Sequence, residues 1–380
     1  MASRSGSFQD QLDALAGRAR LRRLSPRTGH DFASNDYLGF AHDPMIAQAV
    51  REAIARGVPV GSGGSRLLRG NAPEHEALEA QAATIFRSEA ALFMANGFAA
   101  NAALLSALPG SDDLIVADAL IHASAHDGMK LGKARSVLAA HSDAQAFADA
   151  IAGWRREGGR GRPWIVVETL YSMDGDVAPV DALAEIAAQH DAMLVLDEAH
   201  ATAVHGPGGR GIGAHLEGRD DVIALHTCGK GLGVEGALVT ATKSIIDLLV
   251  NKGRSFVFST SPSPLIAVAV SAALERMLDA DRERAQLAVL IENAAQHLCA
   301  PFGLDPPKSQ ILPVLIGDDA RTMRVATILQ EAGFDVRGIR PPTVPRGTSR
   351  LRISMTLNVD EPIIAALGDA LQQALAAEPA

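Results

Sequence analysis

Short apolar runs that alternate with helical patterns constrain the fold of this 380-residue chain more than any other feature. Four of them are LIVAD (114–118), WIVVET (164–169), MLVLDEAH (193–200) and VIALHT (222–227). Alternating strands and helices are typical of a mainly parallel sheet with helices on both faces. We therefore predict an α/β fold, with polar residues at the carboxyl ends of the strands, where ligands bind in such sheets.

The pattern changes near both ends of the chain. Leucines and alanines at helical spacing over residues 9–23 predict an amphipathic N-terminal helix. After residue 277 a charge-rich helical segment is followed by ILPVLIG (311–317), a helix near 321–333 and RLRIS (350–354). We predict an N-terminal helix and arm over 1–40, a large domain over 41–277 and a smaller α+β domain over 278–380.

Composition excludes several classes of protein. A formal net charge of −9 argues against general nucleic-acid binding, which needs clustered Lys and Arg. The two cysteines, Cys228 and Cys299, support neither a disulfide framework nor a cysteine-rich zinc site. The apolar run 265–274 is too short to span a bilayer, and the N-terminus lacks a signal-peptide core. We expect a cytoplasmic protein that binds neither nucleic acid nor membranes.

Lys230 is the first candidate for chemistry. It lies between Gly229 and Gly231, directly after a predicted buried strand. Desolvation at such a place lowers the pKa of an amine, as a nucleophile that forms an imine requires. By itself, a lysine of this kind is more often a solvated loop residue. Its neighbours favour a chemical role.

Asp197 ends the run MLVLD, 33 positions before Lys230. That spacing fits one strand-helix-strand unit, so both residues can lie at one edge of the sheet. A carboxylate there could keep the pyridinium nitrogen of pyridoxal phosphate (PLP) protonated, and His200 could reach the ring's phenolic oxygen. The alternative is that Asp197 and Glu198 cap a helix and His200 is a loop histidine.

Further residues could hold a phosphate and a ring. In ANGFAAN (95–101) a small turn precedes a predicted helix, so the amides of Gly97 and Phe98 could bind phosphate. Thr227 could add a hydroxyl, and His122 could stack on the ring. His122 and His126 could instead be metal ligands, but no third ligand has suitable spacing, and we predict no metal.

Two other motifs point to rival functions. Gly231, Gly233 and Gly236 form a GxGxxG after a strand, which could indicate an NAD-type oxidoreductase. Lys230 precedes the first glycine, which does not fit that fingerprint. The tetrad DEAH (197–200) occurs in helicases, but the chain has no GxxxxGK followed by Ser or Thr to cradle ATP. A non-enzymatic binding module on the same fold is the third alternative.

Taken together, the motifs resemble the α-oxoamine synthase family of fold-type I PLP-dependent transferases, over nearly the whole chain. They are FASNDYLGFAHDP, GSGGSRLLRGN, GFAAN, HAS, ETLYSMDGDVAP, DEAHATAVHGPGGRG, TCGK and GIRPPTVPRGTSRLRIS, in this order. The sequence differs from many relatives at His141-Ser142-Asp143 (HND in those relatives), at Ala201 and at Glu235.

The resemblance implies roles for individual residues. Lys230 would hold the cofactor as a Schiff base, with Asp197 at the pyridine nitrogen and His122 on the ring. It further implies a homodimer, with Thr260 offered to the partner's phosphate. Other implied cofactor contacts are Gly97, Phe98, Glu168, Ser172, His200 and Thr227, and implied substrate contacts are Arg22, Thr343 and Arg352.

The implied reaction joins L-alanine to pimeloyl-CoA, or to a pimeloyl carrier-protein thioester, with loss of CO2 and CoA, as in biotin biosynthesis. Lys230 would remove the α-proton of alanine, and His122 would hold the ring and polarise the thioester carbonyl. The motif PPTVPRGTSRLRIS (341–354) favours this acyltransferase over glycine-using relatives. The alternative is a family member with another amino acid or acyl-CoA, such as a 5-aminolevulinate synthase.

Overall fold

The computed structural model describes residues 4–378, so the first three residues of the predicted arm and the last two of the predicted C-terminal domain lie outside it. The described chain divides into two compact units. The larger unit comprises Leu38–Ser172 and Asp176–Arg284. The smaller unit comprises residues 4–37, Met173–Gly175 and 285–378.

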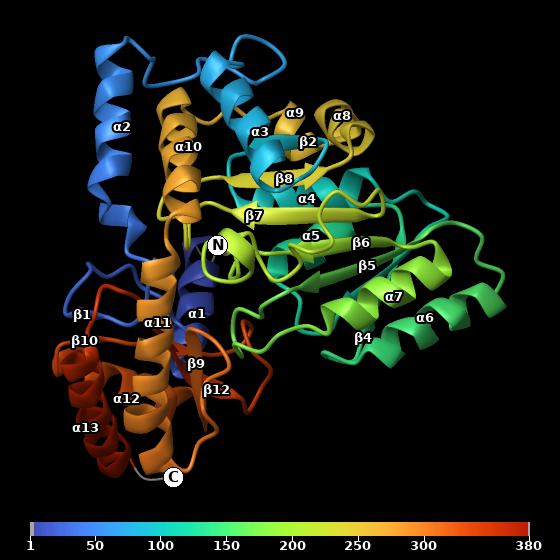
Figure 1. Ribbon diagram of the computed structural model, residues 1–380. Helices are drawn as coiled ribbons and strands as arrows, with labels where there is room; N and C mark the ends of the chain where they lie inside the picture. Colours follow the sequence, from blue (N-terminus) through green and yellow to red (C-terminus); the bar gives the residue numbers. More distant parts are fainter. Residues whose placement is uncertain (1–3, 379–380) are drawn as a thin grey trace. The chain divides into compact units, whose positions relative to one another are not determined.

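The larger unit, all of whose residues are described, is built on a seven-stranded sheet with the order β2-β8-β7-β6-β5-β3-β4 (Figure 1). β8 runs antiparallel to both of its neighbours, and the other pairs are parallel. The predicted mainly parallel α/β sheet is confirmed. The strands are β2 (Ala90–Met94), β3 (Leu114–Asp118), β4 (Arg135–Ala139), β5 (Pro163–Glu168), β6 (Met193–Asp197), β7 (Val222–Thr227) and β8 (Ala237–Ala241).

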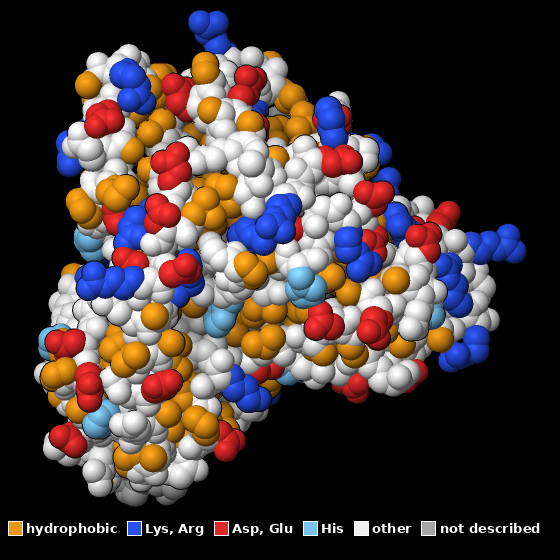
Figure 2. All heavy atoms as spheres, viewed as in Figure 1, with side chains coloured by type: hydrophobic (Ala, Val, Ile, Leu, Met, Phe, Trp, Pro, Cys, Tyr) orange, Lys and Arg blue, Asp and Glu red, His pale blue; other side chains and the backbone are white. Residues whose placement is uncertain are grey.

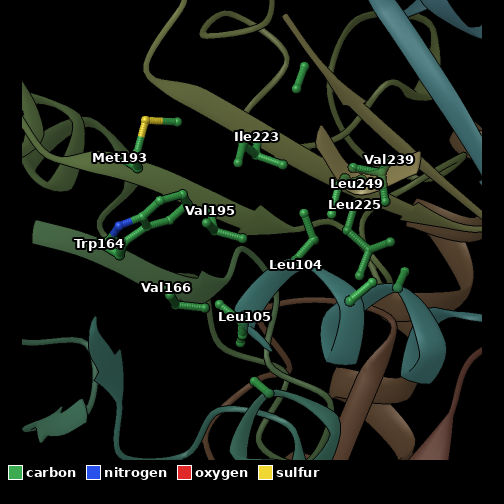
Figure 3. Close-up of a cluster of buried hydrophobic side chains, with 14 of the residues drawn as sticks. Leu104, Leu105, Trp164, Val166, Met193, Val195, Ile223, Leu225, Val239 and Leu249 are labelled. Carbon is green, nitrogen blue, oxygen red and sulfur yellow. The ribbon is translucent and has the colours of Figure 1, made fainter. Parts of the chain in front are cut away.

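Both faces of this sheet are buried, because successive side chains of a strand point to opposite faces. Trp164 and Val166 belong to one apolar cluster (Figure 3), whereas Ile165 and Val167 belong to another. Residues of α4, α5, α8 and α9 contribute to the first cluster, and residues of α6 and α7 contribute to the second. The helices of this unit are α2 (Pro44–Ala55), α3 (Pro73–Ile85), α4 (Gly97–Ala107), α5 (Ala123–Leu131), α6 (Ala144–Arg156), α7 (Val180–His190), α8 (Lys243–Lys252), α9 (Arg254–Val257) and α10 (Pro264–Leu278).

Within residues 4–37 and 285–378, the smaller unit forms a three-stranded antiparallel sheet, β11-β12-β9, and a parallel pair, β1 with β10. The N-terminal helix ends at Gly17, earlier than the periodicity over 9–23 predicts, and Ala19 takes a left-handed φ of 53°. Helix α11 (Asp281–Ala294) begins in the larger unit and continues in the smaller one. The other elements are α1 (Arg4–Gly17), β1 (His30–Asp31), β9 (Ile311–Gly317), α12 (Asp319–Glu331), β10 (Phe334–Asp335), β11 (Arg337–Ile339), β12 (Ser349–Ser354) and α13 (Glu361–Ala377).

On the face shown in Figure 2, basic and acidic side chains are interspersed with hydrophobic ones. None of the helices in residues 4–378 is long and apolar enough to cross a membrane.

Candidate active site

The carboxyl ends of three neighbouring strands carry predicted cofactor residues. Glu168, Asp197 and Thr227 are the last residues of β5, β6 and β7, and Glu168 pairs with Asp197 in register. His122 caps the start of α5, four residues after β3, and Lys230 follows β7 by three residues. These residues therefore lie along one edge of the sheet, where ligands bind in α/β folds.

Gly97, the first residue of α4, lies against the end of β7. A Cβ added to Gly97 would come within 2.6 Å of Thr227 Cγ2. Asn96 caps the helix by accepting the amide of Ala99 at 2.8 Å. A helix start with glycine at the close approach suits a phosphate, because unpaired amides and the helix dipole favour an anion. Phe98 follows Gly97 in this first turn, as predicted from ANGFAAN.

Two buried carboxyl groups lie side by side at this edge. Glu168 and Asp197 are 2% and 5% exposed. Burial, and then the charge of Asp197, raise the pKa of Glu168 to about 8, against the opposing charge of Lys230. Glu168 Oε2 accepts the amide of Ser172 at 3.2 Å, whereas no group in residues 4–378 pairs with its Oε1. Glu168 is therefore largely protonated near neutral pH.

Asp197 is held by two donors. Its Oδ1 accepts the amide of Ala199 at 3.0 Å, and its Oδ2 accepts Asn101 Nδ2 at 2.8 Å. His200, 4% exposed, follows in the same loop. A carboxylate fixed in this way suits a permanent partner for a cationic ring nitrogen.

The charge of Lys230 acts on this cluster. Lys230 is half-buried. Burial lowers the pKa of His122, and among the charges around it Asp197 opposes that effect while Lys230 adds to it. The charge of Lys230 also lowers the pKa of Glu168, against the larger effect of burial. An amine, an imidazole and two carboxyl groups thus share one electrostatic environment.

Three site residues were not predicted. Asn101 and Ser124 link Asp197 to His122, and both are buried. Glu198 accepts Thr169 Oγ1 at 2.6 Å and the amide of Gly213 at 2.6 Å, which holds the loop near residue 213. In the sequence, Asn101 is distinguished only as an amide side chain among the apolar residues of the helix GFAANAALLSA.

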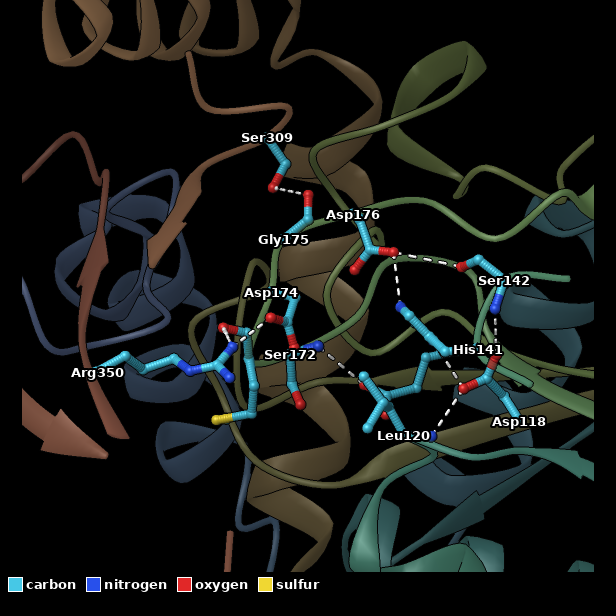
Figure 4. A network of polar contacts seen from close by, with 12 residues as sticks. Asp118, Leu120, His141, Ser142, Ser172, Asp174, Gly175, Asp176, Ser309 and Arg350 are labelled. Atoms are coloured by element: carbon cyan, nitrogen blue, oxygen red, sulfur yellow. Dashed lines mark hydrogen bonds and ion pairs between the residues drawn. The ribbon is translucent and has the colours of Figure 1, made fainter. Parts of the chain in front are cut away.

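His141, which stood out only as part of a departure from the family motif, connects the end of β3 with the loop of Asp176 (Figure 4). Its Nδ1 and Nε2 each lie 2.8 Å from a carboxylate, Asp118 and Asp176 respectively. Ser142 donates its amide to Asp118 at 2.9 Å. Burial alone would lower the pKa of His141, but the hydrogen bonds and charges of the two carboxylates raise it.

The predicted substrate residues belong to the smaller unit. Arg22 donates to Thr343 Oγ1 at 3.2 Å, so these two are brought together. Arg352, on β12, is buried and donates to Ser354 and Asn35. Arg350, two residues earlier on the same strand, pairs with Asp174 (Figure 4).

The cluster in the larger unit fits PLP. It offers an amine, a fixed carboxylate, a glycine-lined helix start and a buried carboxyl oxygen, Glu168 Oε1, that lacks a partner among the described residues. Residues 4–378 hold no group of three or more His, Cys, Asp or Glu side chains suited to a metal ion.

Known proteins are similar to this chain in sequence and in fold. A sequence model of the aminotransferase class I and II family matches residues 27–367. An 8-amino-7-oxononanoate synthase of Anaeromyxobacter dehalogenans is 40% identical over 98% of this chain and 94% of its own. A serine palmitoyltransferase structure with its PLP internal aldimine matches at 27% identity and a TM-score of 0.85, covering 91% of this chain and 87% of that one. The 8-amino-7-oxononanoate synthase of Francisella tularensis matches at 26% identity and a TM-score of 0.78, covering 92% and 98%.

Proposed function

The chain belongs to the class I and II aminotransferase family and is a PLP-dependent enzyme, and on this premise we propose that it condenses L-alanine with a pimeloyl thioester. The products would be 8-amino-7-oxononanoate, CO2 and the free thiol, a step of biotin biosynthesis. The observation that carries the proposal is the meeting of Lys230, Asp197 and the start of α4 at one edge of the sheet. We further infer that the enzyme works in the cytoplasm.

Each residue of the cluster would have a distinct task. Lys230 would hold the cofactor covalently, Asp197 would pair with its ring nitrogen, and the first turn of α4 with Thr227 would bind its phosphate. His200 and Ser172 would contact the cofactor, and His122 would stack on its ring. Bound there, PLP supplies an electron sink that stabilises negative charge on the α-carbon of the amino acid.

The chain's own groups would then move and hold protons. Once the amino group of alanine has replaced it on the cofactor, the amine of Lys230 would take the α-proton of alanine, in surroundings that it shares with Glu168 and His122. A protonated Glu168 keeps a second negative charge away from Asp197, so Asp197 alone would balance the ring nitrogen. Arg22, Thr343 and Arg352 would bind the substrates, and the guanidinium of Arg352 would offer a forked pair of donors to the carboxylate of the amino acid.

The substrates can be tested directly. The purified chain should gain a visible absorption band with PLP, and that band should change on addition of L-alanine. With pimeloyl-CoA added, thiol release and 8-amino-7-oxononanoate, measured by mass spectrometry, should appear together. Turnover with L-serine and palmitoyl-CoA, or with glycine and succinyl-CoA, and none with L-alanine and pimeloyl-CoA, would refute the proposed substrates. It would leave the family assignment unchanged.

We also propose a homodimer that shares its active sites. Hydrogen bonds connect the loop of residues 60–71 with the segment 258–261. The hydroxyl of Ser62 donates to the carbonyl of Ser261 at 2.8 Å, and the amide of Ser261 donates to the carbonyl of Gly64. Both stretches expose large apolar side chains, with Leu68 85% and Phe258 74% exposed. Exposed apolar side chains grouped in this way are typical of a subunit interface. Thr260, in the same segment, would reach the phosphate of the partner subunit.

A further inference from the structure

A buried hydrogen-bonded relay joins Asp197, Asn101, Ser124 and His122. Asn101 Nδ2 lies 2.8 Å from Asp197 Oδ2 and 3.0 Å from Ser124 Oγ, and Ser124 Oγ lies 2.7 Å from His122 Nδ1. Asn101 is 2% exposed and Ser124 is fully buried, so water does not compete for these bonds. The relay thus connects the side chain proposed for the ring nitrogen with the one proposed for the ring face.

The backbone holds the middle of the relay in place. Asn101 lies on α4 and Ser124 on α5. A Cβ added to Gly128 of α5 would come within 2.7 Å of the carbonyl oxygen of Asn101, so the two helices approach closely there. This close packing fixes the backbone positions from which the side chains of Asn101 and Ser124 extend.

Asp197 fixes the orientation of the Asn101 amide. A carboxylate only accepts hydrogen bonds, so the amide must turn its nitrogen, not its oxygen, toward Oδ2. The reverse orientation would place two acceptor oxygens 2.8 Å apart. The same nitrogen therefore also donates to Ser124 Oγ, and the hydroxyl oxygen of Ser124 is an acceptor in this bond.

Ser124 in turn fixes the tautomer of His122. Because its oxygen accepts from Asn101, its own proton is available to the other neighbour, His122 Nδ1. The backbone amide of Ser124 points to the same nitrogen at 3.3 Å. Two donors thus meet Nδ1, which leaves the ring proton on Nε2. Burial, which lowers the pKa of His122, also favours the neutral ring, with Lys230 and His126 adding to it and Asp197 opposing it.

We propose that Asn101 and Ser124 are positioning residues that hold His122 as its neutral Nε2–H tautomer and Asp197 as an oriented carboxylate. The tautomer gives His122 a donor at Nε2 for an oxygen that gains negative charge during the reaction. Resting on the proposed function, we identify this oxygen as the acyl thioester carbonyl, which such a donor stabilises best when it is already in place.

The test reads the tautomer itself. Histidine labelled with ¹⁵N in the holoenzyme should give a His122 signal of the neutral Nε2–H form, assigned by its loss in His122→Gln. Ser124→Ala removes the hydroxyl, and Asn101→Asp removes the amide donor, so both should move that signal toward a mixture of tautomers. Ser124→Thr keeps the hydroxyl and should restore the wild-type signal. Asn293→Ala, a buried asparagine of α11, should leave the signal unchanged.

Kinetics give a second readout. In Ser124→Ala, kcat should fall roughly ten- to hundredfold while KM for the amino acid stays close to that of the wild type. A wild-type His122 that carries its proton on Nδ1, or both protons, overturns the proposal, and so does a Nε2–H signal that neither Ser124→Ala nor Asn101→Asp alters. The spectra need no substrate, so a chain with the expected tautomer that fails to join L-alanine to pimeloyl-CoA refutes only the proposed substrates.

Discussion

Two neighbouring carboxyl groups with different charges define the site at the scale of single residues. Glu168 and Asp197 end adjacent strands in register, yet Asp197 accepts from Ala199 and Asn101 in two different segments, whereas Glu168 accepts from Ser172. Burial and the charge of Asp197 keep Glu168 largely protonated below a pKa of about 8. The site therefore concentrates one fixed negative charge where a cationic ring nitrogen would need it, and Lys230 supplies the opposite charge nearby.

Two replacements of Lys230 distinguish the role of its amine as a nucleophile from the role of its positive charge. Lys230→Ala should abolish the visible band of the bound cofactor and lower turnover on the order of a thousandfold or more. Lys230→Arg keeps a positive charge but has no amine nucleophile, so it should be equally inactive. Lys243→Ala is the matched control, because the side chain of Lys243 is exposed and pairs with Asp247 of the same helix, α8. Substantial turnover in Lys230→Arg would contradict a covalent role.

At the scale of elements, the close approach of helix α4 to the end of strand β7 requires a residue without a side chain at position 97. Gly97→Ala would place a methyl group 2.6 Å from Thr227 Cγ2, and overpacking of this kind costs roughly 1–3 kcal/mol. We expect the dissociation constant of PLP, measured by titration of the cofactor, to rise about tenfold or more. Thr227→Ser removes Cγ2 and keeps the hydroxyl, so the double variant should recover most of the affinity.

Two outcomes would contradict this account of the glycine. A Gly97→Ala variant that binds PLP normally, or a double variant that recovers nothing, would show that the contact with Thr227 does not limit the approach of the helix. Gly17→Ala is the control, because a Cβ there would meet nothing within 4 Å.

His141 should make the stability of the folded protein depend on pH. Its folded-state pKa is raised, so its bonds to Asp118 and Asp176 stabilise fully below the unfolded value near 6.5 and are lost as pH rises through the folded value. His141→Gln should lower the free energy of unfolding by on the order of 2 kcal/mol below pH 6.5, and by less at higher pH. Thermal unfolding of both proteins across this range measures the difference, with the exposed His215→Gln as control.

Sequence patterns predicted the elements of this site better than its contacts. Apolar runs marked β3, β5, β6 and β7 correctly, because a strand buried on both faces must be apolar throughout. They could not predict that Asn101 would meet Asp197, 96 positions away, since hydrogen bonds between distant segments leave no local pattern. The end of the first helix was also missed, because leucines and arginines continue past Gly17 at helical spacing while the backbone turns at Ala19.

At the scale of the whole molecule, the proposed homodimer makes each active site depend on two chains. The loop of residues 60–71 and the segment 258–261 present Leu68, Phe258 and the exposed Thr260 from the larger unit. Burial of such side chains on association would favour a stable pair. We expect sedimentation of the purified protein to give twice the chain mass of 39.7 kDa.

Subunit mixing tests whether Thr260 acts across the interface. Lys230→Ala and Thr260→Ala homodimers should each be poorly active at limiting PLP, the first for want of the amine and the second through weaker phosphate binding. If Thr260 serves the partner's site, a mixed dimer holds one site with both defects and one site with neither, so mixing should restore activity. If Thr260 serves its own chain, each site of the mixed dimer keeps one defect, and mixing restores nothing. Recovery that follows the fraction of mixed dimers therefore establishes a shared site, and its absence would leave each subunit with a complete site of its own.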